Sequence, residues 1–487
     1  EEIEMANTRA APRMLMATAA FSVIPIRPLA CAAGADRSIS YSARLVSQPP
    51  DLIKWVRREG GFVHHGLTIA QSQGSYGLGL VASENISKGS DLIGLPDHLP
   101  LKFPALESDG ENSVESVSVN LARQVPEGLW AMRLGLKLLH ERAVVGSLWW
   151  PYIANLPEAY SLPIFFSGED IKNLQYAPLL YQINKRCRFL LDFEKEVQGI
   201  LENVKPGDRP FGGQNVDASS LGWAMSAASS RAFHLQGSSV PMMLPLIDMC
   251  NHSFNPNARV VLERHAGNSN ILVKVVAETQ IEQSDPLLIN YGCLSNDLFL
   301  LDYGFVATAN PYDCIELVYD SALLDAASMA AGFSSPCFSS PSPWQQAMLS
   351  RLNLGDDAPN LKISIGGEEV VDGRLLAALR ILLAGDVQAV EKHDSRTLGS
   401  LSAEAPVGIA TEIAVLRTLT ALGVICLRHF PTTIAEDESL LKRSENEATR
   451  LAIQFRIEKK ALIVRVLNDF ARRIGSLQWK EDDAAQR

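Results

Sequence analysis

Hydrophobic and polar positions follow two different rhythms along this chain. Between residues 51 and 103, short apolar runs alternate with glycine-containing turns, as in "YGLGLVASENISKGSDLIGLPDHLPL", and this pattern predicts short strands. Between residues 129 and 203, apolar residues recur every three or four positions, as in "LWAMRLGLKLLHERAVVG", and this spacing predicts helices. Residues 240–305 return to strand-like runs, "ILVKVVAETQI" and "DPLLINYG". The order predicts one β unit that is split by a helical insertion.

The C-terminal part of the chain has a mostly helical pattern. It follows the stretch 331–343, "AGFSSPCFSSPSP", which is rich in Ser and Pro and marks a linker or loop. "GRLLAALRILLAG" then predicts an amphipathic helix bounded by glycines, and Ser444 with Glu447 predicts a capping box at the start of a long helix. Further upstream, Ser167 with Asp170 marks another helix start. No internal repeat interrupts this reading of strands, helices, strands and a helical domain.

Charge and hydropathy argue against two classes of partner. The net charge of −11 argues against an extended phosphate-binding surface, so no nucleic-acid partner is predicted. The most apolar long run, residues 408–430, contains Glu412 and Arg417, which would be costly in a bilayer. We therefore interpret this run as a buried helix and predict no membrane insertion. A chain of 487 residues with 47% hydrophobic content fits a globular protein of two or three domains.

Two features of the composition bear on the cellular compartment. The seven cysteines are dispersed without a CxxC or CxC pair, which argues against structural zinc and suggests a reducing environment. The stretch from Met5 to Pro50 is rich in Arg, Ala and Ser, and carries no lysine and one acid, Asp36. This composition is typical of an organelle transit peptide, although a secretory signal around "MLMATAAFSVI" is the rival interpretation. Because Arg and Ser continue past that apolar run, we favour the transit peptide.

The segment "PLIDMCNHSFNPNARV", residues 245–260, gathers an acid, a cysteine and a histidine beside an Asn-Pro-Asn turn. His252 has no second His or Cys at ligand spacing, and Asp248 alone does not complete a site, so no metal is predicted. On residue type alone, His252 is commonly a structural hydrogen-bonding side chain. Cys250 would need exposure and a polarising partner to act as a nucleophile, and its apolar context favours a buried, inert thiol.

Two tyrosines follow this segment, Tyr291 in "NYG" and Tyr303 in "DYGF". One interpretation places both in the core, at the ends of a strand and a helix. Buried phenol hydroxyls need hydrogen-bond partners, however, and such hydroxyls can hold an amine or a methyl group in a channel. The two residues by themselves leave both interpretations open.

A family resemblance follows from the order of these motifs. "PLIDMCNHSFNPNA" followed by "LINYGCLSNDLFLLDYGFV" resembles the SET-domain methyltransferases, and within them the Rubisco large-subunit methyltransferase-like branch. Further segments that are similar to this branch are "GLGLVASENISKG", "SLWWPYIANLPEAYSLPIFF", "SSRAFHL" and "FPTTIAEDESLLKRSENEATRLAIQFRIEKKALI". The resemblance covers roughly residues 50–475. The ordered series is far more specific than an isolated Asn-His-Ser triplet.

The resemblance implies an α+β fold in which a β-rich SET domain with a pseudoknot is interrupted by a helical insert. An all-α C-terminal substrate-binding domain is expected to follow. The expected boundaries are 1–50 for the transit peptide, 51–309 for the SET domain with its insert at about 105–230, 310–478 for the helical domain and 479–487 for a tail. The absence of a post-SET cysteine cluster fits this branch, which closes its site with helices.

The resemblance also implies S-adenosylmethionine as the cofactor, bound where the chain threads through a knot-like crossing. Tyr291 is expected to be the catalytic tyrosine, because a hydroxyl with an ordinary pKa of about 10 orients an amine without adding charge. The other roles carried over from the family are cofactor binding by Tyr76, Gly77, Leu78, Arg231, Asn251 and His252, and substrate binding by Arg231, Asp248, Tyr291 and Tyr303. Tyr76 departs from the family, which often has Glu there, and this puts the adenosine contact in doubt.

These expectations describe a plastid protein-lysine N-methyltransferase of the chloroplast stroma, with the mitochondrion as the alternative location. Its substrate would be the Rubisco large subunit or another stromal enzyme. Two other functions stay open: a protein-histidine N-methyltransferase of the same fold, and a non-catalytic SET scaffold that binds a plastid complex. The joint presence of Tyr291, Asn251 and Arg231 argues against the scaffold, which has no chemical use for all three.

Overall fold

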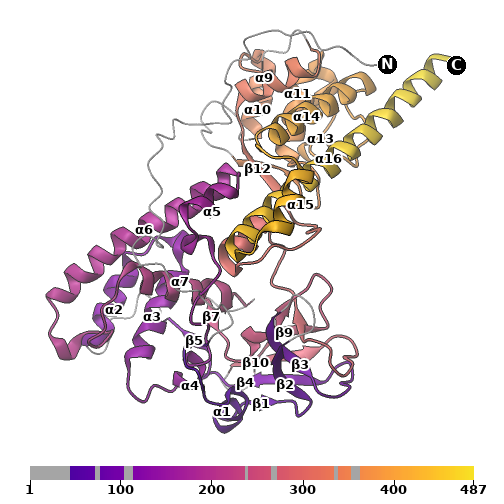
Figure 1. Ribbon diagram of the computed structural model, residues 1–487. Coiled ribbons are helices and arrows are strands. Elements are labelled where there is room, and N and C mark those ends of the chain that lie inside the picture. Colours follow the sequence, from indigo (N-terminus) through magenta and orange to yellow (C-terminus); the bar gives the residue numbers. More distant parts are fainter. Residues whose placement is uncertain are drawn as a thin grey trace. The chain divides into compact units, whose positions relative to one another are not determined.

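The computed structural model (Figure 1) describes residues 44–71, 77–103, 113–235, 240–264, 271–333, 338–352 and 362–486. The chain divides into two compact units. Within the described residues, the first unit comprises 44–307 with Glu445–Ala452, and the second comprises Thr308–Ser444 with 453–486. The division at Thr308 lies close to the expected boundary at residue 309. Tyr76 and most of the expected transit peptide lie outside the described residues, so these predictions stay predictions.

The first unit contains several small sheets. The largest is antiparallel with the order β1-β4-β10-β9, and Val275 of β10 lies opposite both Ile93 of β4 and Val260 of β9. Buried and half-buried positions alternate along β10, as expected for a strand with one face on the core. The strands of this sheet are β1 Phe62–Val63, β4 Asp91–Leu95, β9 Ala258–Arg264 and β10 Ile271–Ala277. The remaining strands of this unit are β2 Leu67–Gln71 with β3 Leu78–Ala82, β5 Leu101–Lys102 with β7 Met242–Met243 and β6 Ala232–Phe233, and β8 Asn251–His252 with β11 Leu288–Ile289.

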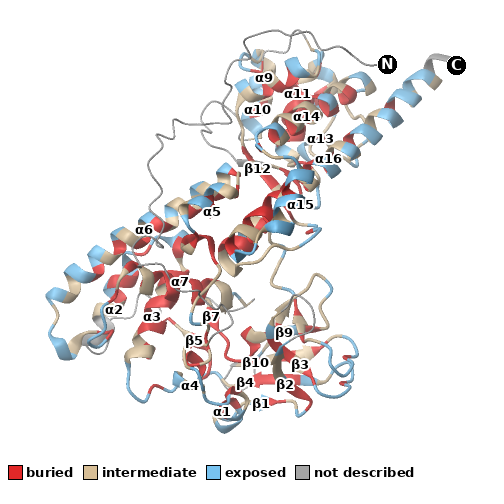
Figure 2. Cartoon of the chain, in the orientation of Figure 1, coloured by how far each residue is buried: buried red, intermediate tan, exposed pale blue. Residues whose placement is uncertain are grey.

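A block of helices separates β5 from β6, and this confirms the helical insertion into a β-rich unit. Helices α3 and α7 pack along each other and are buried over most of their length (Figure 2). Gly135 permits this contact, because a Cβ there would lie 3.0 Å from the Ala224 carbonyl carbon. Ser167 caps α5 as predicted and accepts the Asp170 N–H at 3.1 Å. The helices of this unit are α1 Leu52–Arg58, α2 Ser113–Arg123, α3 Ala131–Ala143, α4 Trp150–Ile153, α5 Gly168–Asn173, α6 Ala177–Glu202, α7 Ala218–Arg231 and α8 Asn296–Leu298.

The second unit is helical as expected, with one addition to the all-α prediction. Strands β12 (Cys314–Val318) and β13 (Lys362–Gly366) form an antiparallel pair. Apolar positions alternate along β12, where Ile315 and Leu317 are buried, and this period of two explains the strand. The helices are α9 Ser321–Ala330, α10 Pro343–Arg351, α11 Gly373–Leu383, α12 Val387–Glu391, α13 Ser395–Leu398, α14 Ile409–Arg428, α15 Ile434–Arg443 and α16 Glu447–Gln486.

The predicted capping box at Ser444 and Glu447 is wrong. Ser444 is the C-terminal cap residue of α15, and the chain reaches α16 through only a short connection. Asn446 lies directly before α16, and its Oδ1 accepts the Thr449 N–H at 3.1 Å. Asparagine is as good an N-cap as serine, so the later residue takes this role.

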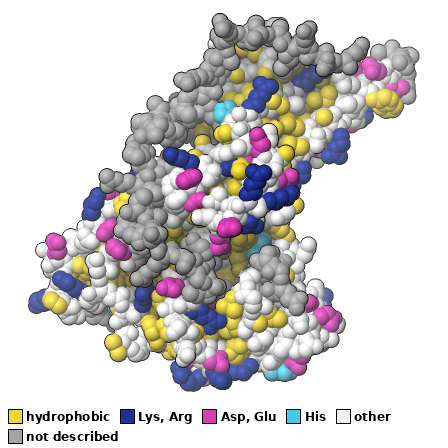
Figure 3. All heavy atoms as spheres, in the orientation of Figure 1, with side chains coloured by type: hydrophobic (Ala, Val, Ile, Leu, Met, Phe, Trp, Pro, Cys, Tyr) yellow, Lys and Arg dark blue, Asp and Glu magenta, His cyan; other side chains and the backbone are white. Residues whose placement is uncertain are grey.

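Among the described helices, α14 is the one long and apolar enough to cross a membrane. One face of α14 is buried within the second unit, and its Glu412 accepts hydrogen bonds from Arg380 of α11. Half of its most apolar window is buried, which fits the core helix that the sequence predicts. On the face shown in Figure 3, the described Lys and Arg side chains occur singly or in small groups among Asp and Glu.

Candidate functional site

A cavity of about 690 Å³ opens in the first unit. Its lining includes Arg231, Asp248, Tyr291 and Tyr303, which come from separate segments of the sequence. Apolar side chains complete much of the wall, among them those of Trp130, Phe233, Leu294 and Leu298. The structure therefore brings all the predicted substrate-binding residues to one space.

Two distant segments are joined beside this cavity by the parallel pair β8–β11. The Asn251 N–H donates to the Leu287 carbonyl at 3.2 Å, and the Ser253 N–H donates to the Ile289 carbonyl at 3.0 Å. Just before β8, buried Leu246 has a φ of 71°, a strained conformation for a branched residue. Such strain concentrates at functional sites, and this one lies where the resemblance predicts a knot-like crossing.

Tyr291 is held by three contacts. Its hydroxyl donates to the Cys250 carbonyl at 2.6 Å, and its backbone N–H donates to His252 Nδ1 at 3.2 Å. Its ring stacks on Tyr303, with the centroids 5.0 Å apart. Burial raises the pKa of the Tyr291 hydroxyl, so the phenol stays protonated at neutral pH. Because its proton is engaged by a carbonyl, the oxygen has lone pairs left to accept an N–H from a ligand.

Tyr303 ends a short π-helix, η6 (Phe299–Tyr303), which continues from α8. Gly304 stops it with a φ of 78°, and a Cβ there would lie 2.8 Å from a backbone oxygen, so only glycine fits. Arg186 of α6 pairs with Asp302 at 2.7 Å and holds the π-helix from the other side. Burial, with the nearby Asp302 charge, raises the pKa of Tyr303 to about 12. π-helical turns are frequent at functional sites, and this one aims a second phenol at the cavity.

Half-buried Arg231 and the fully buried Asp248 carboxylate form an ion pair that lacks some of its partners. Arg231 Nη1 lies 3.0 Å from Asp248 Oδ2, and the Tyr152 hydroxyl donates to the same oxygen at 2.7 Å. Burial raises the pKa of Asp248, whereas the Arg231 charge and the Tyr152 hydroxyl oppose that shift. Among the described residues, neither Asp248 Oδ1 nor Arg231 Nε has a hydrogen-bond partner. Buried polar atoms without partners are costly, so this pair is arranged to receive a ligand.

Of the predicted cofactor residues that the structure describes, Arg231 lines the cavity, whereas Gly77, Leu78, Asn251 and His252 do not. The backbone of β3 presses on Asn251, because a Cβ at Gly79 would lie 2.4 Å from Asn251 Nδ2. That nitrogen has no hydrogen-bond partner among the described residues, and it can donate to a ligand oxygen. Gly77 has a φ of 71° at the start of β3, and Leu78 is exposed. The backbone at Gly77 and Leu78 and the Asn251 side-chain amide are therefore both able to contact a ligand.

The histidine and the cysteine of this segment are not placed for acid–base, nucleophilic or metal chemistry. Burial lowers the pKa of His252 to about 4, so its ring is neutral near pH 7. Within the described part of the chain, His252 belongs to no three-residue group of metal-type ligands. Cys250 is fully buried and burial raises the pKa of its thiol, which fits the predicted inert side chain. Both residues instead position Tyr291, one through its ring nitrogen and one through its carbonyl.

Sequence reasoning missed two tyrosines beside the ion pair, of which Tyr152 bonds Asp248 directly. Tyr152 and Tyr160 lie in "SLWWPYIANLPEAYSLPIFF", which we read only as a family signature. Tyr152 is buried and Tyr160 is half-buried, both close enough to Arg231 and Asp248 to interact electrostatically, and burial of its hydroxyl raises the pKa of Tyr160 to about 12. The sequence signal that could have indicated them is the high number of aromatic residues in this short stretch of the helical insert.

Two protein-family models match this chain. The model for the SET domain matches residues 77–292, and the model described as Rubisco LSMT substrate-binding matches residues 339–463. The chain therefore carries a SET domain followed by a substrate-binding domain of the Rubisco LSMT type, in the order that the motifs predict.

Individual relatives are more distant. The mouse actin-histidine N-methyltransferase is 25% identical over 89% of this chain and 70% of its own length, and the human protein of that name is 24% identical over the same shares. Among solved structures, Rubisco LSMT bound to AdoMet aligns with a TM-score of 0.59 and 20% identity, covering 88% of this chain and 92% of its own. The SET domain of LSMT bound to lysine and AdoHcy aligns equally well, over 88% and 91%. These structural similarities show the fold.

Proposed function

We propose that this protein is an S-adenosylmethionine-dependent protein N-methyltransferase whose acceptor is a lysine side chain. The observation that carries the proposal is the placement of Tyr291: its hydroxyl donates to Cys250 at 2.6 Å, while its ring lines the same cavity as Asp248 and stacks on Tyr303. The SET domain match and the methyltransferase names of the relatives support it.

The residues beside the cavity fit the cofactor. S-adenosylmethionine supplies, when bound, a methyl group that its sulfonium charge already activates. Asn251 Nδ2 is a buried donor in need of an acceptor, and Arg231 Nε is a second one; both suit oxygen atoms of such a molecule. The residues that would hold it are Gly77, Leu78, Arg231, Asn251 and the backbone of His252, with Tyr76 as a further candidate outside the described residues.

The chain's own residues would prepare and orient the amine. A lysine ammonium that enters a largely apolar cavity loses hydration, and this lowers its pKa and favours the neutral nucleophile. Tyr291 then accepts one N–H with a lone pair of its hydroxyl oxygen, and this turns the nitrogen lone pair away from the phenol. Positioning of this kind supplies at most about 7–11 kcal/mol of the barrier. Tyr303 lines the same cavity and narrows it beside Tyr291.

Two features of the cavity favour lysine over histidine. Its apolar side chains suit the methylene stem of a lysine, which has no polar atoms before its terminus. Asp248 Oδ1 remains as an acceptor for a cationic group before deprotonation. The second candidate is a protein-histidine N-methyltransferase, and the observation that favours it is the name of the relatives that span 89% of this chain.

The experiment is methyl transfer with an identified acceptor residue. The protein would be incubated with methyl-labelled S-adenosylmethionine and a chloroplast stromal extract, and the labelled peptides mapped by mass spectrometry. We expect label on lysine, and far less of it from a matched Tyr291→Phe preparation at the same incubation time. Label on histidine would establish the second candidate. Cofactor binding by calorimetry without any labelled protein would favour the non-catalytic scaffold.

For the substrate and the location, we propose the Rubisco large subunit or another stromal enzyme, in the chloroplast stroma. The match to a Rubisco LSMT-type substrate-binding domain supports the first, and the basic, acid-poor composition of Met5–Pro50 supports the second. Residues 1–50 fused to a fluorescent protein should direct it to plastids in plant cells. A mitochondrial signal would favour the alternative location.

A further inference from the structure

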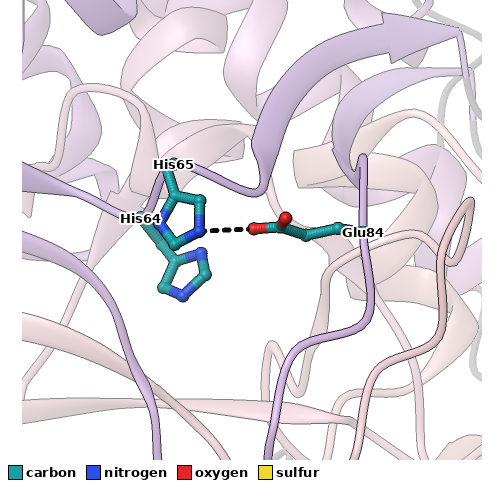
Figure 4. Close-up of side chains that lie close together, drawn as sticks. All are labelled: His64, His65 and Glu84. Carbon is teal, nitrogen blue, oxygen red and sulfur yellow. Dashed lines mark ion pairs between the residues drawn. The ribbon is translucent and has the colours of Figure 1, made fainter.

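A second group of chemically capable side chains lies at one end of the β2–β3 ribbon. His64 and His65 precede β2, Glu84 follows β3, and none of the three lines the cavity. Figure 4 shows the three side chains gathered at one point, with His65 turned toward Glu84. One ligand-type atom from each residue lies within 4.8 Å of the other two. Two imidazoles and a carboxylate are a ligand set that Zn²⁺ and similar ions accept.

The two histidine rings are already arranged together. His65 Nε2 lies 2.7 Å from Glu84 Oε1, and the two rings stack with their centroids 4.4 Å apart. The Gly66 N–H donates to His64 Nδ1 at 3.0 Å, which keeps the lone pair of the neutral ring on that nitrogen.

The backbone holds these residues in place. The Ser83 N–H donates to the Gly66 carbonyl at 2.7 Å, which pairs the chain just before β2 with the chain just after β3. A Cβ at Gly66 would lie 2.7 Å from both Cγ and Oε1 of Glu84. Glycine at this position therefore leaves the room in which the Glu84 side chain lies across the turn toward the histidines.

We propose that His64, His65 and Glu84 bind one divalent transition-metal ion, with water completing the coordination. Two ligand atoms on a tetrahedral Zn²⁺ lie about 3.3 Å apart, so modest side-chain rotations would bring the present atoms, which lie within 4.8 Å of one another, into range. The ion would replace the His65–Glu84 contact and the hydrogen bond to His64 Nδ1. Its role would be structural, because it ties together the ends of β2 and β3. The other end of this ribbon carries Gly77 and Leu78, the predicted cofactor segment.

The test uses the full chain, freed of metal by a chelator and titrated with zinc chloride in a calorimeter. We expect one site, and a rise in melting temperature on zinc addition. His65→Ala and Glu84→Gln should each weaken zinc binding by more than about tenfold, since losing even an outer-shell partner has that effect. Gly66→Ala should also weaken zinc binding, because the added Cβ would displace the Glu84 side chain. His98→Ala, at an exposed histidine elsewhere in the same unit, is the matched control and should bind zinc as the parent does.

Exposed thiols also bind zinc, so every titration would be run in a Cys293→Ser background. The proposal is wrong if the His65→Ala and Glu84→Gln proteins bind zinc as tightly as that background. It is also wrong if binding disappears with Cys293, which would indicate an adventitious ion only. None of these readouts depends on methyl transfer, so the result stands apart from the proposed function.

Discussion

Two arginine–carboxylate pairs, one in each unit, are satisfied to very different degrees. In the second unit, Arg380 bonds both oxygens of Glu412, at 2.8 and 2.6 Å. Its remaining donors reach the carbonyls of Thr397, Leu398, Ser400 and Ala403. In the first unit, half-buried Arg231 reaches one carboxylate oxygen of Asp248 at 3.0 Å and the Asp248 carbonyl at 3.4 Å, and its Nε has no partner among the described residues.

The contrast separates a structural charge from a functional one. A buried network that is fully bonded fixes local structure and has nothing left to offer a ligand. A pair whose donors and acceptors lack hydrogen bonds destabilises the folded protein, and a ligand that supplies those hydrogen bonds is bound more tightly as a result. By this criterion Arg380 belongs to the core of its unit and Arg231 belongs to the site. Substitutions at the two positions should therefore affect different measurements.

The largest effect is expected for Arg380→Leu. It leaves the Glu412 carboxylate buried without its partner, and breaking a buried pair in this way costs about 3–5 kcal/mol. Urea unfolding followed by circular dichroism would measure the loss. The double variant Arg380→Leu with Glu412→Leu should recover part of it, because no charge is left uncompensated. A loss below about 1 kcal/mol for the single variant would contradict the comparison.

Arg231→Lys should give the opposite profile. A lysine keeps the charge beside Asp248 and loses the planar fork, so we expect stability to change by less than about 1 kcal/mol. Affinity for S-adenosylmethionine or turnover should fall roughly 10- to 100-fold, as expected for the loss of a hydrogen bond to a charged group. Calorimetry and steady-state kinetics on the same preparation would check this. Equal losses of stability for the Arg231 and Arg380 variants would contradict the assignment of one arginine to the site and the other to the core.

A smaller effect is expected for Tyr152→Phe. The change removes one hydrogen bond to the Asp248 carboxylate, worth about 1.5 kcal/mol, while Arg231 keeps its contact with the same oxygen. We expect reduced catalytic efficiency because Asp248 is less well held. Initial rates at several acceptor concentrations would test it. Tyr160→Phe is the matched control, since no hydrogen bond to Asp248 is lost there, and an equal deficit in both variants would argue against the assigned role.

A further prediction concerns the pH dependence of stability. His252 has a pKa of about 4 in the folded protein against 6.5 for an ordinary histidine. The folded state therefore resists a proton that the unfolded state takes up, so this stabilisation is complete above pH 6.5 and is lost as the pH falls toward 4. Unfolding free energies across this window should decline less steeply for His252→Gln than for the parent. Identical slopes would show that His252 does not contribute.

The sequence predicted those parts of the molecule that local pattern controls. Apolar spacing placed the helical insert between two strand-rich segments, and Ser167 marked the start of α5 correctly. Ordered motifs identified Arg231, Asp248, Tyr291 and Tyr303, which the fold brings to one cavity. Short motifs could do this because their spacing is tied to one particular chain crossing.

The remaining features depend on tertiary contacts that no local pattern reports. Tyr152 lies 96 residues from Asp248 along the chain, so only folding reveals that the two share a hydrogen bond. The carbonyl of Cys250, which receives the Tyr291 hydroxyl, is a backbone atom that any residue type supplies. Asn446, and not the predicted Ser444, caps α16, because α15 extends to Arg443 and Ser444 ends that helix. Ends of elements are decided by such local competition.

The central claim is that the Tyr291 hydroxyl orients the acceptor amine while other residues hold the cofactor. The most direct test compares the parent with Tyr291→Phe in paired measurements of S-adenosylmethionine affinity and single-turnover methyl transfer to the mapped acceptor. We predict unchanged affinity and a transfer rate lower by about 100- to 1,000-fold, the loss typical of one preorganised hydrogen-bonding group. Transfer at the parental rate by the phenylalanine protein would contradict the claim.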